Sequence, residues 1–150
     1  MPESRTPATP IELLLVEDNP ADVRLIQETF RDGKLHIEIS VAEDGLDGLA
    51  YLRREGKHAN ATRPDLVLLD LSLPRKGGLE VLSEIKRDPD LKRIPIIIIT
   101  SSEAERDIVS AYENHANCYL NKPVGLDQFV SLVRSLEHFW LSIVKLPPSK

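Results

Sequence analysis

Four short and mostly apolar runs, each followed by a polar or charged residue, constrain the fold of this chain more than any other feature. The runs and the residues that follow them are 11–16 with Glu17 and Asp18, 66–69 with Asp70, 96–99 with Thr100, and 118–120 with Lys122 close behind. Runs of this length and composition are typical of strands buried in a parallel sheet. Because the carboxyl ends of parallel strands meet at one edge, we expect these polar residues to converge on one small acidic site.

The segments between the runs carry helical patterns. Residues 36–41 alternate apolar and polar side chains, which predicts a half-buried edge strand. Helical spacing of apolar residues and N-cap residues predict helices at about 20–32, 44–56, 78–87, 103–115 and 125–144. Five strands that alternate with five helices predict a doubly wound α/β domain.

The chain length and the proline-containing N-terminal segment predict one folded unit. The 150 residues are enough for a single domain with a sizeable core, which we place at 11–144 including a long last helix. The proline-containing segment 1–10 is expected to be a flexible lead-in, and 145–150 a short tail. The polar connection 56–64 is longer than usual and predicts a surface insertion. Since few residues follow the last helix, we expect no separate output domain.

Charge and cysteine content limit the partners. The net charge of −5 is spread over mixed acidic and basic residues without a basic block, which argues against nucleic acid or an anionic membrane as the main partner. The single cysteine, Cys118, cannot form an internal disulfide, and no stretch is long and apolar enough for a membrane span. We therefore expect a cytoplasmic protein.

The side chains at the strand ends predict phosphoryl chemistry. Glu17, Asp18 and Asp70 would bring three carboxylates together, and such a cluster needs a cation. Oxygen ligands without nearby histidine or cysteine favour Mg²⁺, which also binds phosphate groups. Lys122 would add a positive charge and Thr100 a hydroxyl group beside a nucleophilic carboxylate. These parts stabilise a phosphoryl group in transfer.

From about residue 11 to 138 the chain resembles a response-regulator receiver domain of two-component signalling. The resemblance rests on the joint occurrence of spaced motifs: LLLVEDN with Glu17 and Asp18, LVLLDLSLP with Asp70, Pro74 and Gly78 after it, Thr100, and Lys122-Pro123 after Tyr119. It implies the flavodoxin-like (βα)5 fold with strand order 2-1-3-4-5. A cis bond is common in the family at Lys122-Pro123, but the sequence does not define the isomer.

The resemblance also implies a role for each motif residue. Asp70 would be the phosphorylated aspartate, Asp18 a metal ligand and Glu17 the holder of metal-bound water. Ser72 would offer its backbone carbonyl to the metal and influence how readily water attacks the acyl phosphate. Thr100 and Lys122 would contact the phosphoryl oxygens, and Tyr119 would rotate inward when Thr100 moves.

Each of these residues also has a purely structural interpretation. Asp70 could end a strand, Glu17 and Asp18 could cap a helix, and Lys122 could be a solvated loop lysine. Two unrelated functions compete as well. A metal-dependent phosphatase would usually need an aspartate where Ser72 stands, and a nucleotide or flavin domain would need a glycine-rich loop after the first strand, which is absent.

The last helix predicts an interface. Its core face is expected to be Phe129, Leu132, Val133, Leu136, Trp140 and Ile143, which leaves Phe139, Leu141 and Val144 on other sides. This extra apolar surface, with the Phe139-Trp140 pair, predicts a homodimer contact or a kinase docking site.

The long connection, NCYLNKPV and the FW pair further resemble single-domain regulators that are paired with cyanobacterial and other bacterial phytochromes. The resemblance implies a stand-alone regulator that takes a phosphoryl group from a phytochrome-type histidine kinase on Asp70 with Mg²⁺. It would then change the face formed by the helix at about 103–115, the strand at 118–120 and the last helix, and would catalyse only its own phosphorylation and dephosphorylation. The alternative is a phosphorelay intermediate or phosphate sink without output.

Overall fold

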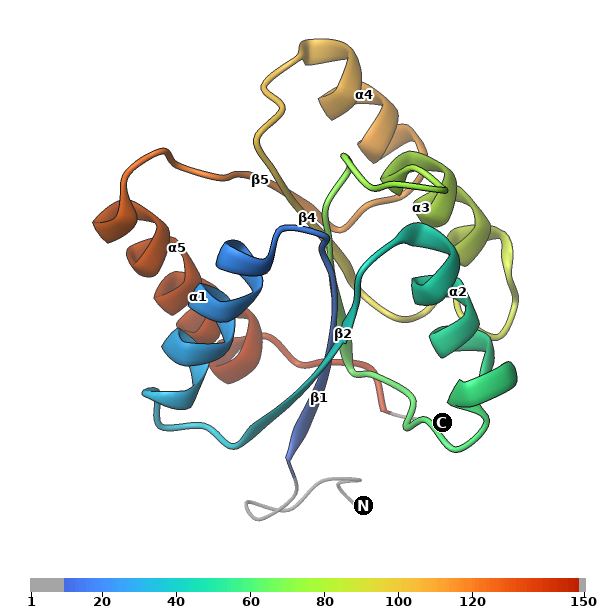
Figure 1. Ribbon diagram of the computed structural model, residues 1–150, viewed down its shortest axis with the longest axis horizontal. Coiled ribbons are helices and arrows are strands. Elements are labelled where there is room, and N and C mark those ends of the chain that lie inside the picture. Colours follow the sequence, from blue (N-terminus) through green and yellow to red (C-terminus); the bar gives the residue numbers. More distant parts are fainter. Residues whose placement is uncertain (1–9, 149–150) are drawn as a thin grey trace.

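The computed structural model describes residues 10–148 and contains a five-stranded parallel sheet in the order β2-β1-β3-β4-β5 (Figure 1). Most of the expected N-terminal lead-in and the last two residues of the tail lie outside the described residues. The strands are β1 (Ile11–Val16), β2 (Ile37–Ala42), β3 (Leu66–Leu69), β4 (Ile96–Thr100) and β5 (Cys118–Asn121). The expected flavodoxin-like order 2-1-3-4-5 is confirmed.

Helices cover both faces of the sheet. The α-helices are α1 (Pro20–Arg31), α2 (Gly45–Arg53), α3 (Gly78–Arg87), α4 (Glu105–Glu113) and α5 (Leu126–His138). In Figure 1, α1 and α5 lie together on one face, and α2, α3 and α4 line the other. The long connection after α2 contains one 3₁₀ turn, η1 (Gly56–His58).

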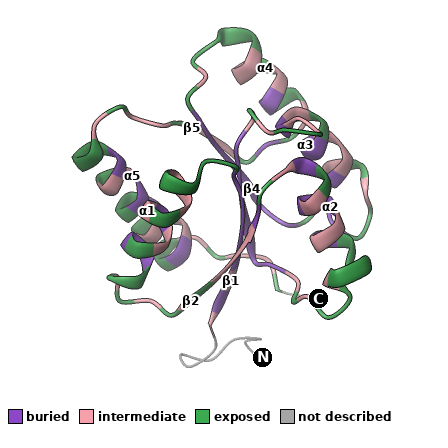
Figure 2. Cartoon of the chain, viewed as in Figure 1, coloured by how far each residue is buried: buried purple, intermediate pink, exposed green. Residues whose placement is uncertain are grey.

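The alternation of side chains along the central strands builds two cores. Leu14, Val67 and Ile98 pack toward α2 and α3, whereas Leu13 and Ile97 pack toward α1 and α5. These five side chains are almost completely buried, and Figure 2 shows much of the central strands in the colour of buried residues. Because successive side chains of a strand point to opposite faces, a continuous apolar run satisfies both cores at once. The apolar runs therefore fix the sheet, and the carboxyl ends of its strands define one edge.

The chain after α5 differs from the expected continuous α-helix up to residue 144. It changes at His138 into a π-helical turn, η2 (Phe139–Ile143), closed by a hydrogen bond from Val144 N to Phe139 O at 2.9 Å. The wider turn rotates the side chains relative to α-helical spacing. As a result Leu141 is buried and Ile143 is exposed, the reverse of the expectation.

Gly78 gives the first prediction, because a side chain there would meet the backbone of the segment after β3. A Cβ atom at Gly78 would lie 2.2 Å from the carbonyl oxygen of Asp70 and 2.6 Å from Cα of Leu71. We expect Gly78→Ala to lower the free energy of unfolding by about 1–3 kcal/mol, the usual cost of overpacking. Urea denaturation measures this difference.

Gly77 provides the matched control for that prediction. A Cβ atom at Gly77 would meet only the tip of the Glu80 side chain, at 3.8 Å. Gly77→Ala is therefore expected to change the free energy of unfolding by less than about 0.5 kcal/mol. Equal denaturation midpoints for the two variants would contradict the close approach at Gly78.

Within residues 10–148, no helix is both long enough and apolar enough to cross a membrane.

Candidate functional site

The polar residues after β1 and β3 form a carboxylate cluster at the carboxyl edge of the sheet. One oxygen from each of Glu17, Asp18 and Asp70 lies within 4.8 Å of the others. Glu17 and Asp70 are buried, whereas Asp18 is exposed. The convergence expected from the sequence is present.

The turn between β1 and α1 holds Glu17 in place. The backbone N–H of Asn19 donates to Glu17 Oε2 at 3.2 Å. The Asn19 side chain caps α1, since its Oδ1 accepts from the N–H groups of Ala21 and Asp22 at 2.9 and 3.2 Å. Asparagine is a preferred N-cap, and proline is favoured directly after it because it needs no N–H partner there. The EDNP sequence therefore starts the helix and orients the acidic side chain together.

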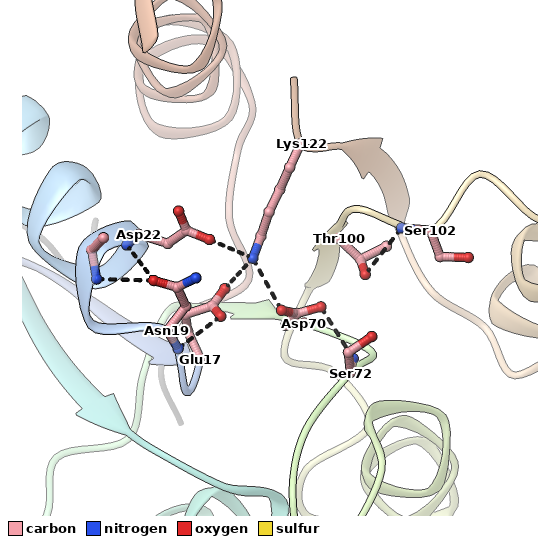
Figure 3. A network of polar contacts seen from close by, with 9 residues as sticks. Glu17, Asn19, Asp22, Asp70, Ser72, Thr100, Ser102 and Lys122 are labelled. Atoms are coloured by element: carbon pink, nitrogen blue, oxygen red, sulfur yellow. Dashed lines mark hydrogen bonds and ion pairs between the residues drawn. The ribbon is translucent and has the colours of Figure 1, made fainter. Parts of the chain in front are cut away.

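Lys122 lies at the centre of the site (Figure 3). Its Nζ donates to Glu17 Oε1 at 2.7 Å, to Asp22 Oδ2 at 2.8 Å and to Asp70 Oδ2 at 3.0 Å. Its backbone N–H donates to the Thr100 carbonyl at 2.8 Å, which ties the loop after β5 to the end of β4. All peptide bonds in the described part are trans, including the one between Lys122 and Pro123. The ammonium group thus neutralises carboxylates from three separate segments.

Burial changes the proton affinities in this cluster. Desolvation is the main reason that the pKa of Glu17 rises to about 7, and the charge of Asp70 adds to the effect, while the hydrogen bond from Lys122 opposes it. Burial favours the neutral amine of Lys122, but hydrogen bonds to Asp22 and Glu17 outweigh it and raise its pKa. The lysine therefore stays charged, and the site remains short of positive charge.

The donor set fits a divalent metal. All candidate ligands are carboxylate oxygens, which hard cations prefer, and two of them, Glu17 and Asp70, share the Lys122 ammonium group with Asp22. Glu17, Asp18 and Asp70 would hold the ion, which would supply positive charge for a phosphoryl oxygen.

Asp70 presents its carboxylate between two donors. Oδ2 accepts from Lys122, and Oδ1 accepts from the backbone N–H of Ser72 at 3.1 Å. Ser72 itself is exposed. The Asp70 carboxylate is therefore positioned by the loop after β3, which packs closely against Gly78.

Thr100 and Tyr119 frame the loop between β4 and α4. Thr100 is fully buried, and its Oγ1 faces the N–H of Ser102 at 3.5 Å. The Tyr119 hydroxyl donates to the Ser102 carbonyl at 2.9 Å, and Asn121 Nδ2 donates to the same oxygen at 2.5 Å. Ser102 Oγ also donates to Asp107 Oδ2 at 2.5 Å. Ser102 is thus the point at which β5 and α4 hold this loop.

The model of the response regulator receiver domain matches residues 13–134. The chain belongs to this family. It is therefore a receiver-domain response regulator rather than a conventional enzyme, and its signalling is based on phosphorylation.

Named relatives of this receiver domain include phytochrome regulators. Response regulator Rcp1 of Synechocystis sp. is 47% identical over 138 residues, which cover 92% of this chain and 94% of the relative. The match to the Mn²⁺-bound structure of Rcp1 covers 92% of this chain and 99% of the Rcp1 chain, with a TM-score of 0.90. The phosphorylated cyanobacterial phytochrome response regulator RcpA is 50% identical, with the same coverages and TM-score. The expected resemblance to phytochrome-associated regulators is confirmed.

The metal-bound relative and the carboxylate cluster together indicate that this receiver domain binds a divalent metal. The individual roles expected for Asp70, Ser72, Thr100, Tyr119 and Lys122 stay predictions.

Two contacts were not predicted from the sequence: Asp22 with Lys122, and Asn121 with the Ser102 loop, residues 101–104 between β4 and α4. Asp22 stands in the first turn of α1, where an acidic residue is normally explained by the helix dipole. The signal that could have found it is a third carboxylate only four residues after Asp18. Asn121 carried no signal, because its partner is a backbone carbonyl.

The Ser102 loop of this receiver domain gives the second prediction. Asn121→Ala removes one of the two side-chain donors to the Ser102 carbonyl, so we expect the amides of residues 101–104 to exchange about 3- to 10-fold faster. Hydrogen–deuterium exchange measures this. Asn60→Ala, an exposed change in the connection before β3, serves as the control. Unchanged exchange in Asn121→Ala would show that Asn121 does not hold the loop.

Proposed function

We propose that this regulator accepts a phosphoryl group from a phytochrome-type histidine kinase on Asp70, with Mg²⁺ as the metal. The observation that supports the proposal most strongly is the placement of Asp70 between the Lys122 ammonium and the Ser72 N–H, within the carboxylate cluster. The similar regulator RcpA is a cyanobacterial phytochrome response regulator, and this supports the choice of kinase.

The transfer forms a bond between a carboxylate oxygen of Asp70 and phosphorus. The bond between phosphorus and the imidazole nitrogen of the kinase phosphohistidine breaks, and the imidazole leaves with the electron pair. Glu17, Asp18 and Asp70, with the Ser72 carbonyl as a further ligand, would hold Mg²⁺, and the ion would supply charge neutralisation for the phosphoryl oxygens. Lys122 adjoins the reacting oxygen and pairs with a phosphoryl oxygen after transfer.

The same proposal assigns the response to the α4-β5-α5 face. Thr100 moves toward the phosphoryl group, and the Ser102 loop with Tyr119 changes position. Exposed apolar side chains already lie on or beside this face: Val109, Tyr112, Val124 and Leu126. The exposed Ser72 leaves water access to the acyl phosphate, which supports self-catalysed dephosphorylation. A cytoplasmic location is part of the proposal, because the ATP-dependent kinase reaction takes place there.

Kinase specificity tests this function. A phytochrome-type histidine kinase and a histidine kinase without a phytochrome region are each autophosphorylated with ATP and mixed with the regulator. We expect phosphoryl transfer to be at least about tenfold faster from the phytochrome-type kinase, since specificity requires a difference in binding between partners. Equal transfer from both kinases would remove the phytochrome assignment, and no transfer from either would contradict the phosphoacceptor function.

A homodimer through the end of α5 and η2 is a separate part of the proposal. Phe139 and Ile143 are 51% and 57% exposed, whereas Trp140 is half-buried and packs against the core beneath α1 and α5. The rings of Phe139 and Trp140 lie 6.0 Å apart in an edge-to-face arrangement. Phe139 is therefore the better side chain for a test of the interface.

Sedimentation velocity of the unphosphorylated and phosphorylated protein measures the dimer. We expect Phe139→Ser to shift the equilibrium toward monomer, because a large exposed aromatic side chain at an interface contributes strongly to association. Leu46→Ser, which changes an exposed apolar residue on α2, is the control. A wild-type protein that stays monomeric in both states would rule the dimer out.

A further inference from the structure

The Lys122 ammonium group contacts three carboxylates that do not have the same function. A lysine ammonium has three N–H donors, and here they reach Glu17, Asp22 and Asp70. Glu17 and Asp70 belong to the group that could hold a metal ion, whereas Asp22 does not. Among the described residues, Asp22 is therefore the one carboxylate partner of the Lys122 ammonium group that lies outside the candidate metal ligands.

A metal ion in this cluster and Lys122 would draw on the same two carboxylates, Glu17 and Asp70. Glu17 Oε2 accepts from the Asn19 N–H and Asp70 Oδ1 accepts from the Ser72 N–H, so the oxygens on the other side of each carboxylate are those that Lys122 occupies. A divalent cation that binds the cluster draws on these carboxylates and repels the ammonium group. The ammonium group then stays in place only if it contacts a carboxylate that does not bind the metal.

Asp22 is held in the position that this partner requires. Its backbone N–H donates to Asn19 Oδ1 at 3.2 Å, which fixes it in the first turn of α1. The positive end of the helix dipole stabilises a carboxylate there. In Figure 3, Asp22 and Asp70 approach the Lys122 ammonium from different sides.

We infer that Asp22 is a positioning residue: it retains the Lys122 ammonium beside Asp70 when a divalent metal binds to Glu17, Asp18 and Asp70. This inference rests on the proposed function and extends it to the order of events at the site. Metal binding weakens two contacts of Lys122 and leaves the third. The ammonium group then needs only a short movement to reach a phosphoryl oxygen on Asp70.

A double-mutant cycle on Mg²⁺ binding tests the inference. Calorimetric titration with Mg²⁺ alone is carried out on the wild type, Asp22→Asn, Lys122→Met and the double variant. In the presence of Lys122, Asp22→Asn is expected to weaken Mg²⁺ binding about 3- to 10-fold, because the lysine then competes fully for Glu17 and Asp70. In the Lys122→Met background, the same change is expected to alter the affinity less than about twofold.

Two further variants exclude simpler explanations. Glu28→Gln removes one negative charge from an exposed position on the same helix and is expected to leave the affinity unchanged. Asp22→Glu keeps the carboxylate and is expected to retain most of the wild-type affinity. Circular dichroism verifies folding, and Lys122→Gln replaces Lys122→Met in the cycle if the latter does not fold.

Each outcome has a definite meaning. Equal weakening by Asp22→Asn in both backgrounds would show a direct effect of its charge on the metal and would overturn the inference. No weakening in the presence of Lys122 would overturn it as well, with the proposed function intact. Absence of Mg²⁺ binding by the wild type would instead contradict the proposed function itself.

Discussion

Asp70→Asn is expected to reduce phosphoryl incorporation from acetyl phosphate by about a thousandfold or more, the scale on which loss of a nucleophile acts. The amide that replaces the carboxylate is a poor nucleophile and carries no charge for the metal or for Lys122. Asp70 is also the carboxylate that contacts both Lys122 and the Ser72 N–H. Intact mass spectrometry after incubation with acetyl phosphate and Mg²⁺ measures the gain of one phosphoryl group.

Asp90→Asn is the matched control for this experiment. Asp90 is an exposed carboxylate between α3 and β4, and the strand that follows it begins at the opposite edge of the sheet from Asp70. Asp90→Asn should therefore gain the phosphoryl group at the wild-type rate. Full labelling of Asp70→Asn would place the acceptor on another side chain, and EDTA should prevent labelling of the wild type if the metal is required.

Lys122→Met is expected to have opposite effects on two properties of the site. Phosphorylation by acetyl phosphate should become about 100- to 1000-fold slower, because a charged donor beside the developing phosphoryl charge is lost. Mg²⁺ binding should become tighter, since Glu17 and Asp70 no longer share their oxygens with an ammonium group. Labelling rates at saturating Mg²⁺ and calorimetric titration measure the two effects separately.

Lys92→Met is the control. It removes an exposed lysine side chain between α3 and β4 and should change neither the labelling rate nor the Mg²⁺ affinity. If Lys122→Met lowered the Mg²⁺ affinity, competition between lysine and metal would be refuted. If it bound Mg²⁺ more tightly but was labelled at the wild-type rate, Lys122 would balance charge at rest without a part in the transfer.

The sequence predicted those parts of the site that depend on the sheet. A parallel sheet places every strand end at one edge, so Glu17, Asp70 and Lys122 could be brought together from the apolar runs alone. Asp22 was not predicted, because a carboxylate in the first turn of a helix already has a local explanation. The contact depends on the direction of the Lys122 side chain, and strand order does not define that direction.

The end of the chain shows a different limit. Apolar spacing of 3.6 residues predicted that Ile143 faces the core, but the spacing itself assumes an α-helix. The π-helical turn, closed by the hydrogen bond from Val144 to Phe139, changes the phase and turns Leu141 inward. Apolar residues fill all of the segment 139–144 except Ser142, so more than one phase was compatible with the sequence.

The π-helical turn also affects how this domain can be used as a building block. The family match ends at residue 134, but Leu136, Leu141 and Leu146 pack with the core beneath α1 and α5. A fusion that joined a new output module directly after the matched segment would remove these side chains and open that core to water. For this regulator the segment that can be transferred to a fusion protein extends to at least residue 146, and an engineered chimera would have to include η2.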